Sequence, residues 1–269
     1  MPRRAFRMGI AGAVLFILLA PAALAQDPWS QPVIGIIIDD IGYRHVDDQR
    51  ALELPGPVAY AVMPHAPFAE MMSELAVKNG KEVLVHMPME PDRMRQNEFL
   101  GPGALTTGMG RDEFLRTVDF NLRSVPGAIG VNNHMGSLLT RSPKQMEWLM
   151  DSLKTRDKFY VDSMTSPLSV AGTMAELKDI PSLRRDVFLD NAQDAPDIQN
   201  QFDELIRVAR RRGRAIAIGH PHPETIAVLQ RRLRELDAYG VTLVSLQHML
   251  NAPTARVIPV AHPVPARSQ

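Results

Sequence analysis

From residue 32 to residue 250, short apolar runs alternate with longer stretches in which apolar residues recur at helical spacing. The apolar runs are continuous, as in Ile34–Ile38 and Ala215–Ile218, which is typical of parallel strands covered on both faces. Repeated strand–helix units predict parallel pairing. We therefore predict an α/β fold, a distorted (β/α) barrel of about seven to eight parallel strands. A doubly wound open sheet is the alternative.

The boundaries of the predicted elements follow these two patterns and the turn residues between them. The predicted strands are Val33–Ile38, Val58–Met63, Glu82–His86, Ala128–Val131, Phe159–Val161, Val187–Leu189, Ala215–Ile218 and Thr242–Ser245. The predicted helices are Pro67–Asn79, Arg111–Ser124, Pro143–Thr155, Pro196–Arg212 and Glu224–Tyr239. Residues 91–110 have little periodicity and are predicted to form a long loop.

The two ends of the chain differ from this central part. Arginines precede a short apolar run and an Ala-Leu-Ala cleavage pattern, so residues 1–25 predict a signal peptide. We expect export to the periplasm or cell envelope, with no stable membrane anchor after cleavage; an uncleaved anchor is the alternative. Residues 26–251 are predicted to form one domain, and residues 252–269, rich in Pro, Ala and Arg, a disordered tail.

Composition excludes several kinds of chemistry. Lys and Arg together number 30, as do Asp and Glu, so the formal net charge is zero. This balance argues against a dedicated nucleic-acid binder, which usually carries a basic excess. The chain has no cysteine, which excludes disulfides, thiolate zinc sites and cysteine nucleophiles. Any metal ion must be held by His, Asp or Glu.

Acidic and histidine side chains follow nearly every predicted strand. A barrel gathers the carboxyl ends of its strands on one face, so these side chains are expected to converge. Carboxylates and imidazoles without thiolates suit a catalytic zinc or similar divalent ion, which acidifies a bound water. The candidates are Asp39, Asp40, His65, His86, Glu90, His134, Asp162, Asp190, His220 and His222.

Asp39 and Asp40 could divide two tasks at such an ion. Adjacent residues on a regular strand, however, point to opposite faces. We therefore expect a local break at Ile41-Gly42, where glycine permits an unusual turn. The alternative without a catalytic role is that the acidic pair caps a following helix.

Three segments resemble motifs of one enzyme family. Residues 38–42, Ile-Asp-Asp-Ile-Gly, resemble its T-F-D-D-G motif. Residues 80–86, Gly-Lys-Glu-Val-Leu-Val-His, resemble the start of its second motif, G-H-E-x-x-x-H. Residues 215–220 and the strand 241–246 resemble its closing part. From about residue 33 to residue 250, the sequence thus resembles the divergent polysaccharide deacetylases, a branch of the NodB-homology carbohydrate esterases.

This resemblance implies a NodB-like barrel and specific roles. Asp39 would be the general base, Asp40 and His86 metal ligands, and His220 the general acid. The second motif usually continues as H-x-x-x-H, but Glu90 stands at its last position. The third ligand is therefore Glu90 or His134, and we favour His134 because it follows a strand. An Arg-Pro-Pro-Tyr motif is missing near His134.

We predict an exported, metal-dependent hydrolase, most simply a zinc enzyme, that deacetylates N-acetylated amino sugars in a peptidoglycan- or chitin-like glycan. A non-catalytic envelope glycan-binding or regulatory protein that keeps the barrel and ion is the alternative. A hydrolase of another ester or amide is a third possibility. Four residues are additional site candidates or simple loop formers: Glu90, His65, Asp162 and Asp190.

Overall fold

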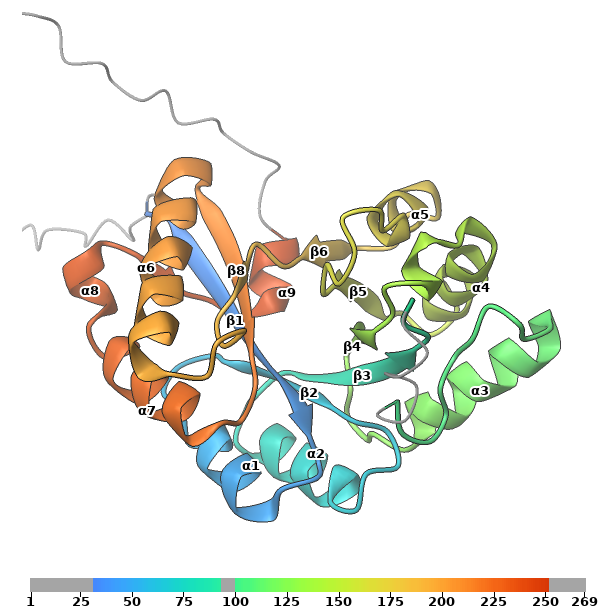
Figure 1. Cartoon of the computed structure of the whole chain (residues 1–269), viewed down its shortest axis with the longest axis horizontal. Coiled ribbons are helices and arrows are strands. Elements are labelled where there is room, and N and C mark those ends of the chain that lie inside the picture. The colour runs from blue at the N-terminus through green and yellow to red at the C-terminus, as the bar shows by residue number, and fades with distance from the viewer. Residues whose placement is uncertain (1–30, 93–99, 252–269) are drawn as a thin grey trace, which may run out of the picture. The chain divides into compact units, whose positions relative to one another are not determined.

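The computed structural model describes residues 31–92 and 100–251. The predicted signal peptide and tail lie outside the described residues. Within them, a parallel sheet curls around a hydrophobic core, and helices cover its outer side (Figure 1). None of the described helices is both long and apolar enough to cross a membrane.

The described residues form one sheet of nine strands. The strands are β1 Val33–Ile41, β2 Ala59–Val62, β3 Val83–Met89, β4 Gly130–Met135, β5 Phe159–Asp162, β6 Ser182–Arg184, β7 Val187–Phe188, β8 Arg214–Gly219 and β9 Thr242–Leu243. The helices are α1 His45–Leu52, α2 Ala69–Lys78, α3 Arg111–Arg123, α4 Pro143–Lys154, α5 Ala171–Leu177, α6 Ala195–Arg212, α7 Pro223–Arg232, α8 Leu236–Tyr239 and α9 Leu246–Leu250, with a 3₁₀ turn at Leu139–Arg141.

The sheet is a distorted, incompletely closed barrel. Its strand order is β6-β5-β4-β3-β2-β1-β8-β7 with parallel pairing, and β9 pairs with the start of β1. β6 and β7 lie at opposite edges, yet only Arg185 and Asp186 separate them in the chain. Three peptide steps span at most about 11 Å, so the sheet must curl until its edges approach. The predicted distorted barrel of parallel strands is confirmed.

Most predicted elements correspond to observed ones. Four short elements were not predicted, because none is longer than eight residues and so none shows a clear period: α1, α5, α9 and β6. β6, for example, buries Leu183 between two polar residues. The predicted helix Glu224–Tyr239 is two helices, because α7 ends at Arg232 and α8 begins at Leu236.

The chain leaves β1 through an irregular turn. Between Ile38 and Ile41 the register of β1 against β2 slips by one residue, as in a β-bulge. Asp40 has a φ of 60° and Gly42 a φ of 120°, so the predicted break begins at Asp40 itself. The Asp39-Asp40 pair does not cap the next helix.

Asp48 in α1 holds this turn in place. Its Oδ2 accepts hydrogen bonds from the backbone N–H groups of Gly42 at 2.8 Å and Arg44 at 3.0 Å. Asp48 is fully buried, and burial raises the pKa of its carboxyl group. The turn that carries Asp40 therefore depends on one buried acceptor oxygen.

We predict that Asp48→Ala destabilises the protein, because one buried and one partly buried N–H group lose their acceptor. The expected loss is about 2 kcal/mol, or roughly 4–8 °C in Tm for a domain of this size. Asp48→Asn is the matched control: its amide oxygen can accept both bonds, and no charge is buried. Thermal unfolding should place this variant near the wild type, and equal losses in the two variants would contradict the role of the shared oxygen.

Candidate metal centre

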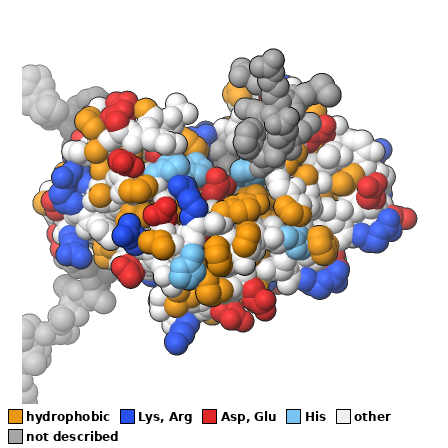
Figure 2. Space-filling model, turned by 60° about the horizontal axis from the view of Figure 1, so that its bottom comes forward, with side chains coloured by type: hydrophobic (Ala, Val, Ile, Leu, Met, Phe, Trp, Pro, Cys, Tyr) orange, Lys and Arg blue, Asp and Glu red, His pale blue; other side chains and the backbone are white. Residues whose placement is uncertain are grey.

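Four parallel strands deliver polar side chains to one end of the barrel. Asp39 and Asp40 lie near the end of β1, His86 in β3 and His134 in β4, and His220 directly follows β8. Figure 2 looks toward this end, and histidine side chains gather there with acidic and basic ones. The common strand direction therefore brings together residues that are far apart in the sequence.

Three potential ligand atoms converge at this end of the barrel. Asp40 Oδ1 lies 3.2 Å from His86 Nε2 and 3.0 Å from His134 Nδ1, and the two imidazole nitrogens are 3.1 Å apart. Ligands about 2.1 Å from one ion, at angles between square and tetrahedral, lie roughly 3.0–3.4 Å apart. Asp40 Oδ1 is also buried without a well-formed hydrogen bond from the described residues. The three atoms fit a divalent ion.

Asn132 fixes the orientation of the His86 ring. Its amide nitrogen donates to Asp39 Oδ1 at 2.8 Å, and its Oδ1 lies 2.8 Å from His86 Nδ1. Because the amide oxygen can only accept, His86 Nδ1 carries a hydrogen, and Nε2 of the neutral ring keeps its lone pair. That lone pair faces Asp40 and His134, in the direction a metal ligand requires.

The charges of the cluster favour a cation among these atoms. Burial alone lowers the pKa of His86, but the carboxylates of Asp39 and Asp40 raise it overall. Burial also opposes ionisation of Asp40, yet its contacts with His134 and His86 hold its pKa well below the usual range. Asp39 is more deeply buried, and burial raises its pKa. The two adjacent carboxyl groups thus have pKa values shifted in opposite directions, and Asp40 stays ionised more readily than Asp39.

His220 lies on another side of Asp40 and has a carboxylate partner of its own. His220 Nε2 is 3.7 Å from Asp40 Oδ2, and its Nδ1 is 3.0 Å from Asp190 Oδ1. Asp190 also accepts hydrogen bonds from the His220 backbone N–H at 2.6 Å and the Thr225 hydroxyl at 2.8 Å. Burial lowers the pKa of His220, but the bond to Asp190 and the nearby carboxylates raise it to about 9. His220 can therefore hold a proton at neutral pH.

Two other predicted candidates have partners outside the cluster. Glu90 Oε2 accepts hydrogen bonds from the backbone N–H and the hydroxyl of Thr107, each at 2.7 Å. His65 Nε2 lies 3.1 Å from Asn121 Oδ1, and its ring stacks on Phe120 with centroids 3.8 Å apart. Neither residue belongs to the groups of side chains that could hold a metal ion in the described part of the chain.

Asp162 and His222 lie near the ends of β5 and β8. Asp162 is buried and accepts hydrogen bonds from the Met164 backbone N–H at 2.8 Å and the Ser169 hydroxyl at 2.7 Å. It therefore shapes the turn after β5. His222 groups with Asp190 and His220 as a second set of potential ligand atoms, but Asp190 is already engaged by His220.

Asn132 and Thr225 were missed by the sequence analysis. Asn132 lies two residues before His134 on the same strand, so both side chains point to the same face. That period of two could have indicated Asn132. Thr225 lies in the first turn of α7, and its sequence position gives no comparable signal.

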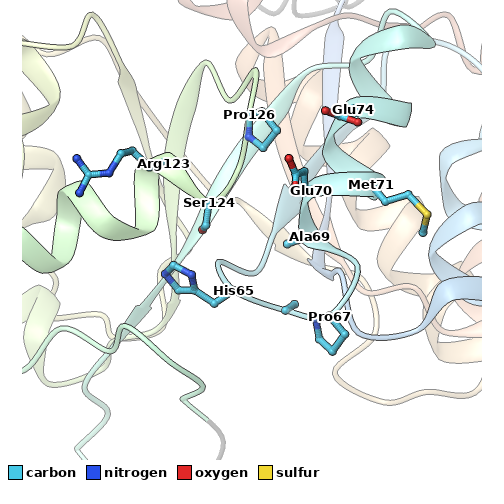
Figure 3. A pocket seen from close by; sticks show the side chains of 10 residues that line it. His65, Pro67, Ala69, Glu70, Met71, Glu74, Arg123, Ser124 and Pro126 are labelled. Atoms are coloured by element: carbon cyan, nitrogen blue, oxygen red, sulfur yellow. The ribbon is translucent and has the colours of Figure 1, made fainter.

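A cavity of about 540 Å³ lies between α2 and the end of α3. Figure 3 shows that the side chains around it come from these two helices, from the segment after β2 and from the segment that follows α3. His65 lines this cavity, whereas Asp40, His86 and His134 do not. The cavity is therefore separate from the convergent ligand atoms, and His65 belongs with it. Its lining residues are His65, Ala66, Pro67, Ala69, Glu70, Met71, Glu74, Arg123, Ser124 and Pro126.

Known proteins resemble this chain in sequence and in fold. An uncharacterized protein of Haemophilus influenzae is 39% identical over 221 residues, which cover 82% of this chain and 78% of that protein. The crystal structure of an uncharacterized Agrobacterium tumefaciens protein matches with a TM-score of 0.78 and 23% identity, covering 81% of this chain and 89% of the other. The latter likeness extends over most of both chains and shows a shared fold.

A peptidoglycan N-acetylglucosamine deacetylase has a related barrel. The catalytic domain of this enzyme from Eubacterium rectale matches with a TM-score of 0.51 and 11% identity, covering 86% of this chain and 95% of that domain. The sequence profile of the divergent polysaccharide deacetylases matches residues 36–250, which span the barrel and the convergent side chains. The chain therefore belongs to the divergent polysaccharide deacetylase family.

Proposed function

We propose that the protein is a metal-dependent carbohydrate deacetylase that hydrolyses the C–N amide bond of N-acetylated amino sugars in a polysaccharide. The proposal rests on the triangle formed by the potential ligand atoms of Asp40, His86 and His134. A second carboxylate, Asp39, and a protonated histidine, His220, flank this triangle. Such a site can both accept and give a proton during amide hydrolysis.

In this mechanism Asp40, His86 and His134 would hold a divalent ion, and the bound ion would supply Lewis-acid chemistry and lower the pKa of water. Asp39 would accept the proton that the attacking water gives up. Its Oδ2 lies 3.6 Å from His86 Nε2, while Asn132 fixes its Oδ1.

His220 gives a proton from Nε2 to the amine nitrogen as the amide C–N bond breaks. Its Nδ1 remains bound to Asp190, so the ring keeps its orientation while the proton leaves. Asp39 and His220 thus divide the two proton transfers, one on the side of the attacking water and one on the side of the departing amine.

We propose Zn²⁺ as the ion and the cell envelope as the location. Two imidazoles and one carboxylate resemble the ligand set of catalytic zinc sites that keep a position open for water. The charged and apolar pattern of residues 1–25 supports export. Because the Eubacterium rectale enzyme acts on peptidoglycan, peptidoglycan-type oligosaccharides are the first substrates to test, followed by chitin-type ones.

We predict that the Zn²⁺-loaded protein binds about one ion per chain and releases acetate from these oligosaccharides. Asp40→Ala should lose the ion and acetate release together, because it removes the charged ligand. The loss should exceed the roughly 10–100-fold effect of removing an outer partner of a ligand. Elemental analysis and an acetate assay measure the two quantities.

Glu90→Gln is the matched control, because Glu90 is engaged by Thr107, and it should keep its metal. Full metal occupancy in Asp40→Ala would refute the ligand set. Oligosaccharide binding without acetate release under several metals would instead support the non-catalytic, glycan-binding alternative. Release of a different acid from another ester or amide would redirect the substrate assignment.

We predict that His220→Gln lowers kcat by about 10²–10⁴-fold, the usual contribution of a positioned general acid. Its metal content should equal that of the wild type, because His220 lies outside the ligand triangle. Asp190→Asn should lower kcat as well, since the ring loses its charged partner. Metal analysis beside steady-state kinetics tests this separation, and loss of the ion from His220→Gln would count against it.

We predict that two Asn132 variants separate metal binding from proton transfer. Asn132→Asp keeps an acceptor for His86 Nδ1 but replaces the donor to Asp39 by a repelling carboxylate, so kcat should fall at least about tenfold with metal affinity retained. Asn132→Ala removes both contacts and should also weaken metal binding roughly 10–100-fold. Metal titration and kcat decide the matter, and equal metal affinities in the two variants would contradict this assignment.

A further inference from the structure

Arg44 lies directly after the turn that carries Asp40, one of the three candidate metal ligands. It stands four residues after Asp40 and immediately before α1. Its backbone N–H donates a hydrogen bond to Asp48 at 3.0 Å, so the backbone from which the side chain extends is fixed. The side chain is about half exposed, with a relative accessibility of 47%. Arg44 is therefore a cation at the rim of the proposed active site.

The guanidinium group of Arg44 has few partners among the described residues. Its Nη2 lies 3.4 Å from His222 Nδ1, and its Nη1 lies 3.9 Å from Asp47 Oδ2. Asp47 is also within 4.0 Å of Arg50, so its carboxylate is shared. A guanidinium group offers five N–H donors, and most of those of Arg44 remain open to a ligand.

His222 keeps the guanidinium group close to the reacting centre. Burial and the positive charges of His220 and Arg44 lower the pKa of His222, so its ring is neutral and Nδ1 can accept from Arg44. His222 Nε2 lies 3.1 Å from the side chain of Gln193. The His220 and His222 rings have centroids 5.8 Å apart. Arg44 thus contacts His222, and the His222 ring in turn lies near His220, the proposed general acid.

The charged groups around Arg44 and the shape of its guanidinium group determine which kind of anion could bind there. A guanidinium fork binds a carboxylate through two parallel hydrogen bonds. Asp40, Asp47 and Asp190 surround the same region, and they would repel a dianionic phosphate more strongly than a singly charged carboxylate. Of these two anions, the carboxylate therefore matches the surroundings of Arg44 better.

We propose that Arg44 binds a carboxylate on a sugar that adjoins the N-acetylated sugar at the metal centre, so that the preferred substrate is an acidic glycan. This inference rests on the proposed deacetylase function. It makes Arg44 a specificity residue, with His222 as the residue that positions it.

The test compares two N-acetylated oligosaccharides of equal length with the Zn²⁺-loaded full chain. One is a neutral chitin-type oligomer, and in the other every second sugar carries a lactyl ether carboxylate. Arg44→Gln should lower the ratio of kcat/KM for the acidic over the neutral oligomer at least about tenfold, the loss expected for one charge-assisted pair. Arg44→Lys should restore part of it. In the wild type, added NaCl should lower this ratio.

Arg50→Gln is the matched control, because Arg50 also approaches Asp47 but has no contact with His222 among the described residues. It should leave both substrates unaffected. Equal losses on both oligomers in Arg44→Gln, at an unchanged Tm, would overturn the inference and leave the deacetylase function intact.

Absence of acetate release from either oligomer by the wild type would count against the deacetylase function instead. Calorimetric binding of the two oligomers to the wild type and to Arg44→Gln then decides the role of Arg44 without catalysis. The role of Arg44 is supported if the wild type binds the acidic oligomer more tightly than the neutral one and Arg44→Gln does not. It is refuted if the wild type binds both oligomers equally.

Discussion

One backbone conformation, the left-handed turn at Asp40, is the constraint on which the site depends. On a regular strand Asp39 and Asp40 would point to opposite faces. The extra residue in β1 and the φ of 60° at Asp40 bring the two carboxylates to 3.6 and 3.2 Å from the same nitrogen of His86. A non-glycine residue pays on the order of 1 kcal/mol for this conformation. The buried carboxylate of Asp48 offsets that cost by binding the backbone that follows.

The second structural principle is the choice of partner for each histidine. His86 has the neutral amide of Asn132 behind it, which keeps a hydrogen on one nitrogen and a lone pair on the other. The pKa values of both histidines are raised by nearby carboxylates, but only His220 has a carboxylate, Asp190, as the hydrogen-bond partner of its Nδ1. A ligand must offer a lone pair, whereas an acid must hold a proton. The two imidazoles of one cluster are thereby suited to opposite tasks.

These arrangements place groups that are unfavourable for folding stability at one end of the barrel. Buried carboxylates and imidazole nitrogens approach one another around Asp40, and its Oδ1 has no well-formed hydrogen bond from the described residues. The fully buried strand core of β1, from Val33 to Ile38, supports this end mechanically. Stability is supplied by apolar packing away from the cluster, whereas in the proposed function the cluster holds a cation and transfers protons.

The barrel, and the gathering of Asp and His side chains at one end of its strands, could be predicted from the sequence. Continuous apolar runs report strands buried on both faces, and Asp and His residues after those runs report a common end of the sheet. The sequence favoured His134 over Glu90 as the third ligand but left both open, because the choice depends on how β4 pairs with β3; the structure places His134 beside Asp40. The same pairing places Asn132 between His86 and Asp39. Local patterns record burial, whereas contacts between strands depend on register and backbone turns that no single segment encodes.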